Sequence, residues 1–221
     1  MKEKEDDRIL EILLTEGLLS KEQIQLIKSK ETSQRVKILK SKSSDIRYSI
    51  VHQSFVSLID VIESLKITST KIGNKILTAD IIMETVAGHL NLPFLKIDPL
   101  KVDSDIVTKV ISRPYAIRHQ LVPIDLSGNT LTVATANPFD HEGIDGIKQT
   151  TEYKVRVAVT TKTDVFKIIT EFYGFKSAIA SAEKELDSKT DLGNLEQYVK
   201  LKSVTELEAT DQHIINAVEY L

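Results

Sequence analysis

The chain has 221 residues, a net charge of −3, a hydrophobic fraction of 41% and no cysteine. This size allows one or two domains with an apolar core, and the missing cysteines exclude disulfides, thiol catalysis and thiolate metal sites. The weakly negative charge predicts no nucleic-acid partner, and no apolar run is long enough for direct membrane insertion.

The first 76 residues carry helical patterns and predict a helical subdomain over residues 1–76. Ser20, with Gln23 three residues later, forms a capping-box pattern that predicts the start of a helix. A further short helix is predicted around residues 56–65. The helix before Ser20 is predicted from an apolar stripe that Gly17 closes, formed by Ile9, Leu10, Leu13 and Leu14.

Residues 28–47 are strongly basic, with seven basic and two acidic side chains. The serines at Ser41, Ser43 and Ser44 predict a loop near the end of this stretch. Three interpretations stay open at this point: a solvated helix face, a docking surface for an acidic partner, or a contact with an anion or phospholipid.

A second domain is predicted over residues 77–175, where the pattern changes to mixed helix and strand. Thr78 is expected to cap a helix over 79–90, and Thr163 is expected to cap one running through Phe172. Ser127-Gly128-Asn129 predicts a hairpin turn between two strands. The fold class is therefore α+β, an N-terminal helical subdomain followed by a small mixed β-sheet packed with helices. Its other predicted elements are helices at 104–110, 114–119 and 141–149 and strands at 121–125, 130–135 and 154–159.

Residues 176–221 are predicted to form a linker and the start of a further domain. The stretch 177–195 is charged and poor in large apolar side chains. The last apolar stripe reaches the final residue, Leu221, without a terminating signal. We expect the chain to be the N-terminal piece of a longer protein.

The sequence lacks the motifs that nucleotide hydrolysis and metal binding require. The closest approach to a phosphate-binding loop, Gly143-Ile144-Asp145-Gly146-Ile147-Lys148, has the wrong spacing and falls in a predicted helix. The five histidines are scattered, and Asp140 is expected to be an N-cap after an Asn137-Pro138 turn. We therefore expect no catalytic residue, no metal site and no cofactor in this chain.

One ordered series of segments carries a resemblance to a known family. It comprises Leu90-Asn91-Leu92-Pro93-Phe94, the run from Val110 to His119, Leu121-Val122-Pro123-Ile124, the strand Leu131 to Ala136, and Asn137-Pro138-Phe139-Asp140. This order resembles the N-terminal domain of the type II secretion and type IV pilus assembly ATPases (general secretory pathway protein E-like), truncated before the catalytic core.

The resemblance implies a non-catalytic docking and regulatory module. In such proteins this domain binds the cytoplasmic domain of an inner-membrane platform protein and couples the motor to protein export. It implies a cytoplasmic location, peripheral at the inner membrane through that partner. ATP, magnesium and hexamer formation are implied only for the downstream core of the full-length ATPase.

The alternative is a cyclic di-GMP-binding sensor, because a subset of these domains carries two tandem helical motifs of the form Arg-Leu-Gly-x-x-Leu-x-x-x-Gly, followed by six residues, Leu and a terminal Gln. The candidate binding residues are Arg8 and Gly17, which fall at the expected offsets of the first motif. Three residues depart from the pattern: Leu10 replaces a glycine, Lys28 a leucine and Glu31 a glutamine. A second motif could begin only at Lys71-Ile72-Gly73, and no second glycine follows it at the required spacing.

Overall fold

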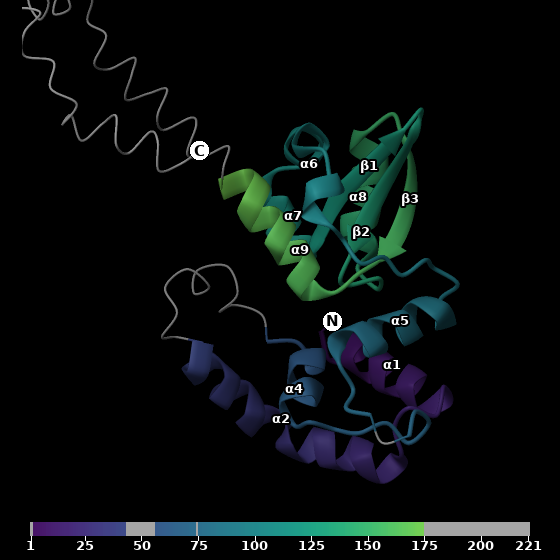
Figure 1. Cartoon of the computed structure of the whole chain (residues 1–221), viewed down its shortest axis with the longest axis vertical. Helices are drawn as coiled ribbons and strands as arrows, with labels where there is room; N and C mark the ends of the chain where they lie inside the picture. Colours follow the sequence, from purple (N-terminus) through teal and green to yellow (C-terminus); the bar gives the residue numbers. More distant parts are fainter. Residues whose placement is uncertain (1, 43–55, 74, 175–221) are drawn as a thin grey trace, which may run out of the picture. The chain divides into compact units, whose positions relative to one another are not determined.

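The computed structural model describes residues 2–42, 56–73 and 75–174 (Figure 1). The chain divides into two units, Met1–Gly174 and Phe175–Leu221, and all described residues belong to the first. The predicted linker and terminal apolar stripe lie outside the described residues, so they stay predictions. The division into domains at residues 76 and 175 likewise stays a prediction.

The N-terminal helices form where the capping and glycine signals place them. Ser20 and Gln23 make the predicted capping box, with Ser20 N–H donating to Gln23 Oε1 (2.9 Å) and Gln23 N–H donating to Ser20 Oγ (3.2 Å). Gly17 has a φ of 72° and ends the first helix, which confirms its predicted role. The bounds are α1 Lys2–Thr15, α2 Lys21–Lys42, α4 Leu58–Ser64 and α5 Ala79–His89.

The basic stretch is helical for longer than predicted. Helix α2 runs through Ser41 to Lys42, where the serine cluster had indicated a loop. Ser41 donates its hydroxyl to the Ile38 carbonyl at 2.9 Å, a helical back-bond that keeps it within the helix. Ser43 and Ser44 lie outside the described residues.

These four helices share one apolar core, to which α5 contributes the side chains of its inward face. Thr78 caps α5 as predicted, accepting a hydrogen bond from Ile81 N–H. The fully buried members come from all four helices and the segment before α5, and include Leu13, Ile27, Leu58, Ile62, Leu77 and Ile82. Burial of these side chains is the main source of stability in this layer.

The sheet has three strands in the order β1-β2-β3, with β1 antiparallel to β2 and β2 parallel to β3. Gly128, with a φ of 60°, makes the predicted hairpin turn between β1 and β2. Helix α8 is the crossover between the two parallel strands. The bounds are β1 Leu121–Ser127, β2 Thr130–Thr135, α8 His141–Thr150 and β3 Lys154–Val159.

Helices that precede β1 and follow β3 along the chain complete this α/β layer. They are η1 Pro99–Lys101, α6 Ser104–Val110, α7 Arg113–His119, α9 Lys162–Ile168 and η2 Ile169–Tyr173. Phe166 is fully buried in their common core, and the Tyr173 hydroxyl donates toward the carbonyls of Val107 (2.7 Å) and Ile111 (2.8 Å). Burial raises the pKa of Tyr173 to about 12. The predicted fold class is thereby confirmed.

The cap of α9 differs from the prediction. Thr161, and not Thr163, accepts the hydrogen bond that starts the helix, from Asp164 N–H at 3.2 Å. The helix therefore begins two residues earlier than Thr163 would allow, directly after the buried end of β3. Thr161 and Thr163 are equally suitable N-cap residues by type. The choice between them therefore depends on where β3 ends and not on the local sequence.

A polar junction joins the helical layer to the sheet layer. Asp60 of α4 pairs with Lys162 of α9, and both side chains are largely buried. Burial by itself would raise the pKa of Asp60. The Lys162 ammonium and hydrogen bonds from Ser57 outweigh that effect and hold the pKa below its usual value. Lys96 makes a second link, lying 2.7 Å from Asp80 Oδ1 and 3.5 Å from Asp164 Oδ2.

We expect Asp60→Asn to lower the free energy of unfolding by about 2 kcal/mol at neutral pH, because it leaves Lys162 without its buried anion. Since the folded pKa of Asp60 is lowered, its contribution is complete above its usual value of 3.8 and is lost as pH falls through the folded pKa. Urea unfolding at several pH values measures the difference. The control Asp145→Asn removes a half-exposed pair with Lys148 and should change little. A constant difference between Asp60→Asn and the parent down to pH 2 would contradict this account.

Within the described ranges, no helix combines the length and apolarity that crossing a bilayer requires.

Candidate functional site

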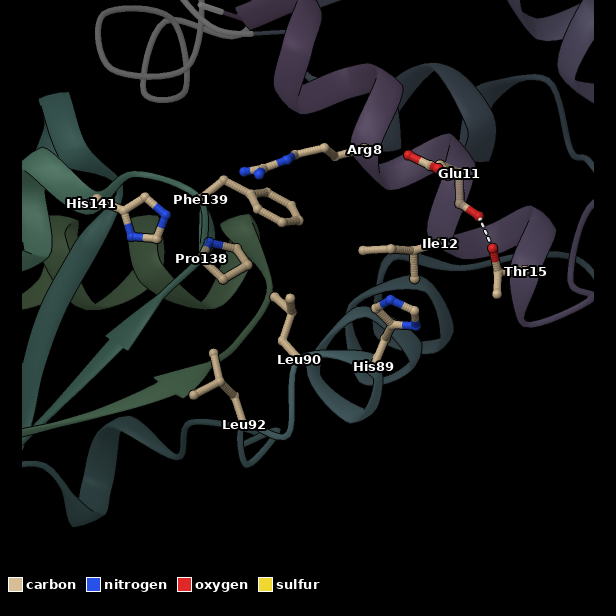
Figure 2. A pocket seen from close by; sticks show the side chains of 10 residues that line it. All are labelled: Arg8, Glu11, Ile12, Thr15, His89, Leu90, Leu92, Pro138, Phe139 and His141. Carbon is tan, nitrogen blue, oxygen red and sulfur yellow. Dashed lines mark hydrogen bonds between the residues drawn. The ribbon is translucent and has the colours of Figure 1, made fainter.

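One pocket lies between α1, the end of α5 and the turn that precedes α8. It has a volume of about 540 Å³, within the range of small-molecule sites. Figure 2 shows side chains from all three segments facing this space. Its lining is Arg8, Glu11, Ile12, Thr15, His89, Leu90, Leu92, Pro138, Phe139 and His141.

Helix α1 supplies one wall through a single face. Arg8, Glu11, Ile12 and Thr15 follow the spacing that places residues above one another on an α-helix. Thr15 donates its hydroxyl to the Glu11 carbonyl at 2.8 Å, so it stays within its own helix. The Arg8 guanidinium lies 5.5 Å from the centre of the Phe139 ring, a cation–π distance. This wall therefore combines one cation, one anion and an apolar centre.

The opposite wall is the predicted Asn137-Pro138 turn. The side chain of Asn137 accepts from Phe139 N–H at 3.2 Å and donates to Glu5 Oε2 at 3.1 Å. Asp140 caps α8 by accepting from Gly143 N–H at 3.0 Å, which confirms its predicted role. Hydrogen bonds of Asn137 and Asp140 thus fix the turn at its start and its end, and Phe139 between them faces Arg8.

A buried histidine supports this turn from behind. His119 Nδ1 lies 2.7 Å from Asp140 Oδ2, and the two side chains are 7% and 15% exposed. Gly143 lies so close that an added Cβ would come within 2.7 Å of three His119 atoms, and one at Gly146 within 2.2 Å of the Tyr115 hydroxyl. The two glycines therefore permit close packing of α8 against α7.

The third wall is the end of α5. His89 Nδ1 lies 2.9 Å from Glu16 Oε1, which ties this end to α1. Leu90 and Leu92 add apolar surface beside it. The Arg8 cation and the Glu11 anion lie on one wall of the pocket, and His89 and His141 line the other walls. This lining suits an anionic ligand with a flat apolar part.

Only one of the two predicted ligand residues reaches this pocket. Arg8 lines it, whereas Gly17 lies at the end of α1 and accepts a hydrogen bond from Thr70 Oγ1 at 2.7 Å. The three residues that depart from the cyclic di-GMP pattern gather elsewhere. Leu10, Lys28 and Glu31 line a separate depression of about 330 Å³, together with Asp6, Asp7 and Thr32. The positions of the cyclic di-GMP motif therefore do not line one common pocket: Arg8 lines the first, and Leu10, Lys28 and Glu31 line the second.

Glu31 has a structural partner in that depression. Arg35 lies 2.7 Å from Glu31 and 2.8 Å from Asp6, which joins α2 to α1. Lys28 similarly lies 2.7 Å from Asp7. These pairs give Lys28 and Glu31 a role in packing the two helices.

Sequence reasoning missed most of the pocket lining, including Glu11, His89, Phe139 and His141. The local signal for Glu11 was its helical spacing from Arg8, but nothing in the sequence indicates that three distant segments meet. Of the other histidines, His119 is a buried packing residue; His52 and His213 lie outside the described residues. In the described part of the chain, no group of three or more potential ligands could hold a metal ion.

The fold and this pocket define an α+β module with a ligand-sized cavity lined by both the N-terminal helices and the turn before α8. Residues 90–179 match the MshEN domain. In sequence, the chain is similar to type IV pilus assembly ATPases.

Two curated relatives are similar to the chain. The type IV pilus assembly ATPase TfpB of Acinetobacter baylyi is 23% identical over 137 residues, 62% of this chain and 23% of that protein. The type IV pilus assembly ATPase PilB of Myxococcus xanthus is 24% identical over 112 residues, 48% of this chain and 20% of that protein. The chain thus spans less than a quarter of the length of either relative.

Solved structures also share similarity with the chain. One, described as MshE with cdg, has a TM-score of 0.46 and 20% identity, and covers 75% of this chain and 98% of its own. The N-terminal domain of XpsE has a TM-score of 0.39 and 17% identity, and covers 64% of this chain and 94% of its own.

Proposed function

We propose that this chain is the non-catalytic docking and regulatory module of a type II secretion or type IV pilus assembly ATPase. It binds the cytoplasmic domain of an inner-membrane platform protein and couples the motor to protein export. The observation that carries the proposal is the MshEN domain over residues 90–179, which includes the whole three-stranded sheet. The module is cytoplasmic and reaches the inner membrane through its partner.

The packing of the two layers supports a preformed binding surface. The Asp60–Lys162 pair and the Lys96 contacts with Asp80 and Asp164 link the helices to the sheet. A surface that is ordered before binding loses less conformational entropy when a partner docks. Partners of this kind are held by an apolar centre with a charged rim.

The glycines of α8 support a non-catalytic role. Gly143 and Gly146 are the pair that most nearly resembles a phosphate-binding loop, and both pack against side chains of α7. A phosphate cradle needs free backbone amides at the end of a loop. ATP, magnesium and hexamer formation belong, in this proposal, to a catalytic core elsewhere in the full-length protein.

Calorimetric titration of the chain with the purified platform cytoplasmic domain tests the docking proposal. We expect saturable binding with a Kd of about 1 μM or tighter, as for a specific protein complex. The control is the cytoplasmic domain of an unrelated inner-membrane protein with similar charge. Absence of binding by a chain whose circular dichroism shows a folded α+β protein would contradict the proposal.

The second candidate function is cyclic di-GMP sensing in the large pocket. The observation that favours it is the Arg8 guanidinium above Phe139, in a cavity that Arg8 and two histidines line. An arginine can pair with a phosphate and stack on a purine base at the same time. Glu11, which lines the same wall, opposes an anionic ligand.

Arg8 variants separate the two candidates. In the sensor account cyclic di-GMP binds saturably, Arg8→Ala weakens binding by about 100-fold, and Arg8→Lys restores little because it cannot stack or bind in a bidentate manner. Arg113→Ala, the same charge change at an exposed position of α7, is the matched control. The docking account predicts no saturable heat with the parent chain. Binding that survives Arg8→Ala would contradict a sensor at this pocket.

A further inference from the structure

Among the residues that the structure describes, none pairs with the outer edge of β3 along its first half. Strand β3 pairs with β2 on one side, and on the other side its one described backbone pairing is at its end, where Phe94 bridges Val159. Figure 1 shows β3 at the margin of the sheet, with the chain after α5 reaching it only near the arrowhead. Edge strands with free backbone groups are templates for a further strand.

The hydrogen bonds fix which backbone groups face outward. Lys154 N–H and Thr160 N–H donate to the β2 side, to Asn129 (2.8 Å) and Thr135 (3.0 Å). Val159 N–H donates the other way, to Pro93 at 2.8 Å, and its carbonyl accepts from Leu95 N–H at 2.8 Å. Because directions alternate along a strand, the N–H and C=O groups of Val155 and Val157 face away from β2.

The side chains beside these groups define the chemistry of a partner. Lys154 and Arg156 are exposed, and Val155 and Val157 are half-buried on the opposite face. A strand added here would set its side chains opposite these residues. Carboxylates would pair with the two cations, and β-branched apolar residues would cover the two valines.

The same charges disfavour a second copy of this chain as the occupant. A two-fold antiparallel pairing of β3 with itself that matches Val155 to Val157 sets Arg156 opposite Arg156. One that matches Val155 to Val155 sets Lys154 opposite Arg156. Like charges directly opposite one another destabilise a strand pair, whereas carboxylates set opposite Lys154 and Arg156 are complementary.

We propose that the β3 edge binds an extended acidic segment of the partner protein by strand addition. This inference rests on the proposed docking function and names its surface. The valine backbone groups supply affinity, and Lys154 and Arg156 supply the preference for acidic sequences. The extended segment Pro93–Leu95, already bonded to Val159 through the isolated bridge at Phe94, shows that this edge accepts a neighbour.

Val157→Pro is the decisive variant. Its N–H faces outward and takes no part in the β2 ladder, so proline at this edge position spares the fold while removing one donor and crowding the added strand. The probe is a peptide of alternating glutamate and valine, titrated against the isotopically labelled chain and followed by amide NMR shifts. Its control is the peptide with lysine in place of glutamate.

We expect the acidic peptide to shift the amides of Val155 and Val157, and Val157→Pro to weaken binding roughly tenfold. The double variant Lys154→Glu with Arg156→Glu should reverse the preference toward the lysine peptide. No binding of the acidic peptide, or equal binding by Val157→Pro, overturns the proposal. So does a dimer of the parent chain, seen by sedimentation, that Val157→Pro abolishes.

Titration of each variant with the platform cytoplasmic domain distinguishes strand addition at β3 from the docking function as a whole. Equal affinity for the parent chain and Val157→Pro overturns strand addition and leaves docking intact. Loss of affinity confined to Val157→Pro and the charge-reversed variant supports both. No affinity for any folded variant overturns the docking function itself.

Discussion

Replacing Phe166 with alanine is expected to lower the free energy of unfolding by about 4 kcal/mol. The ring is fully buried where α9 meets the sheet, in the same cluster as Leu121, Leu131 and Val133. Its removal takes away apolar burial and leaves a cavity that the surrounding strands cannot close fully. Urea unfolding followed by circular dichroism gives the change.

The matched control is Leu100→Ala, because Leu100 is 96% exposed on the turn η1. We expect no measurable change in its unfolding midpoint. A loss for Phe166→Ala no greater than that for Leu100→Ala would mean that the α9 face does not pack on the sheet as described.

The second large effect is expected at Gly143, where alanine should lower the free energy of unfolding by about 2–3 kcal/mol. An added Cβ would come within 2.7 Å of Cβ, Cγ and Nδ1 of His119, atoms held close to the α7 backbone. His119 cannot retreat without lengthening its 2.7 Å contact with Asp140. The change should therefore also disturb the turn that presents Phe139.

Gly88→Ala provides the control for this prediction. Gly88 lies in α5 with nothing within 4 Å of an added Cβ, so alanine there should stabilise the fold by about 0.5–1 kcal/mol. Thermal unfolding compares the two variants, and opposite signs are expected. If Gly143→Ala also stabilised the protein, close packing of α8 on α7 would be refuted.

Local patterns predicted the α+β fold well, because each element carries its own signal. The bounds of β2 and β3 coincide with the predicted strands 130–135 and 154–159, where alternation is clear and Gly128 fixes the hairpin. The start of α9 was missed because Thr161 and Thr163 can both cap a helix. Helix α2 continued through Ser41, the first serine of the predicted loop, and its inward face packs on α4.

The candidate site was predictable only in part. The motif pattern pointed to Arg8, and the turn chemistry gave Asp140 its role as a cap. The pocket itself joins residues 8–15, 89–92 and 138–141, and no local pattern records that these segments meet. The outward direction of Val155 and Val157 also depends on which strand lies beside β3, which a single strand pattern does not specify.

The measurement that tests docking most directly is a calorimetric titration of the platform cytoplasmic domain into this chain, repeated with saturating cyclic di-GMP. We predict a Kd of about 1 μM or tighter that does not change with the nucleotide. No binding in the absence of cyclic di-GMP, followed by binding in its presence, would contradict the account and make the pocket at Arg8 the controlling site.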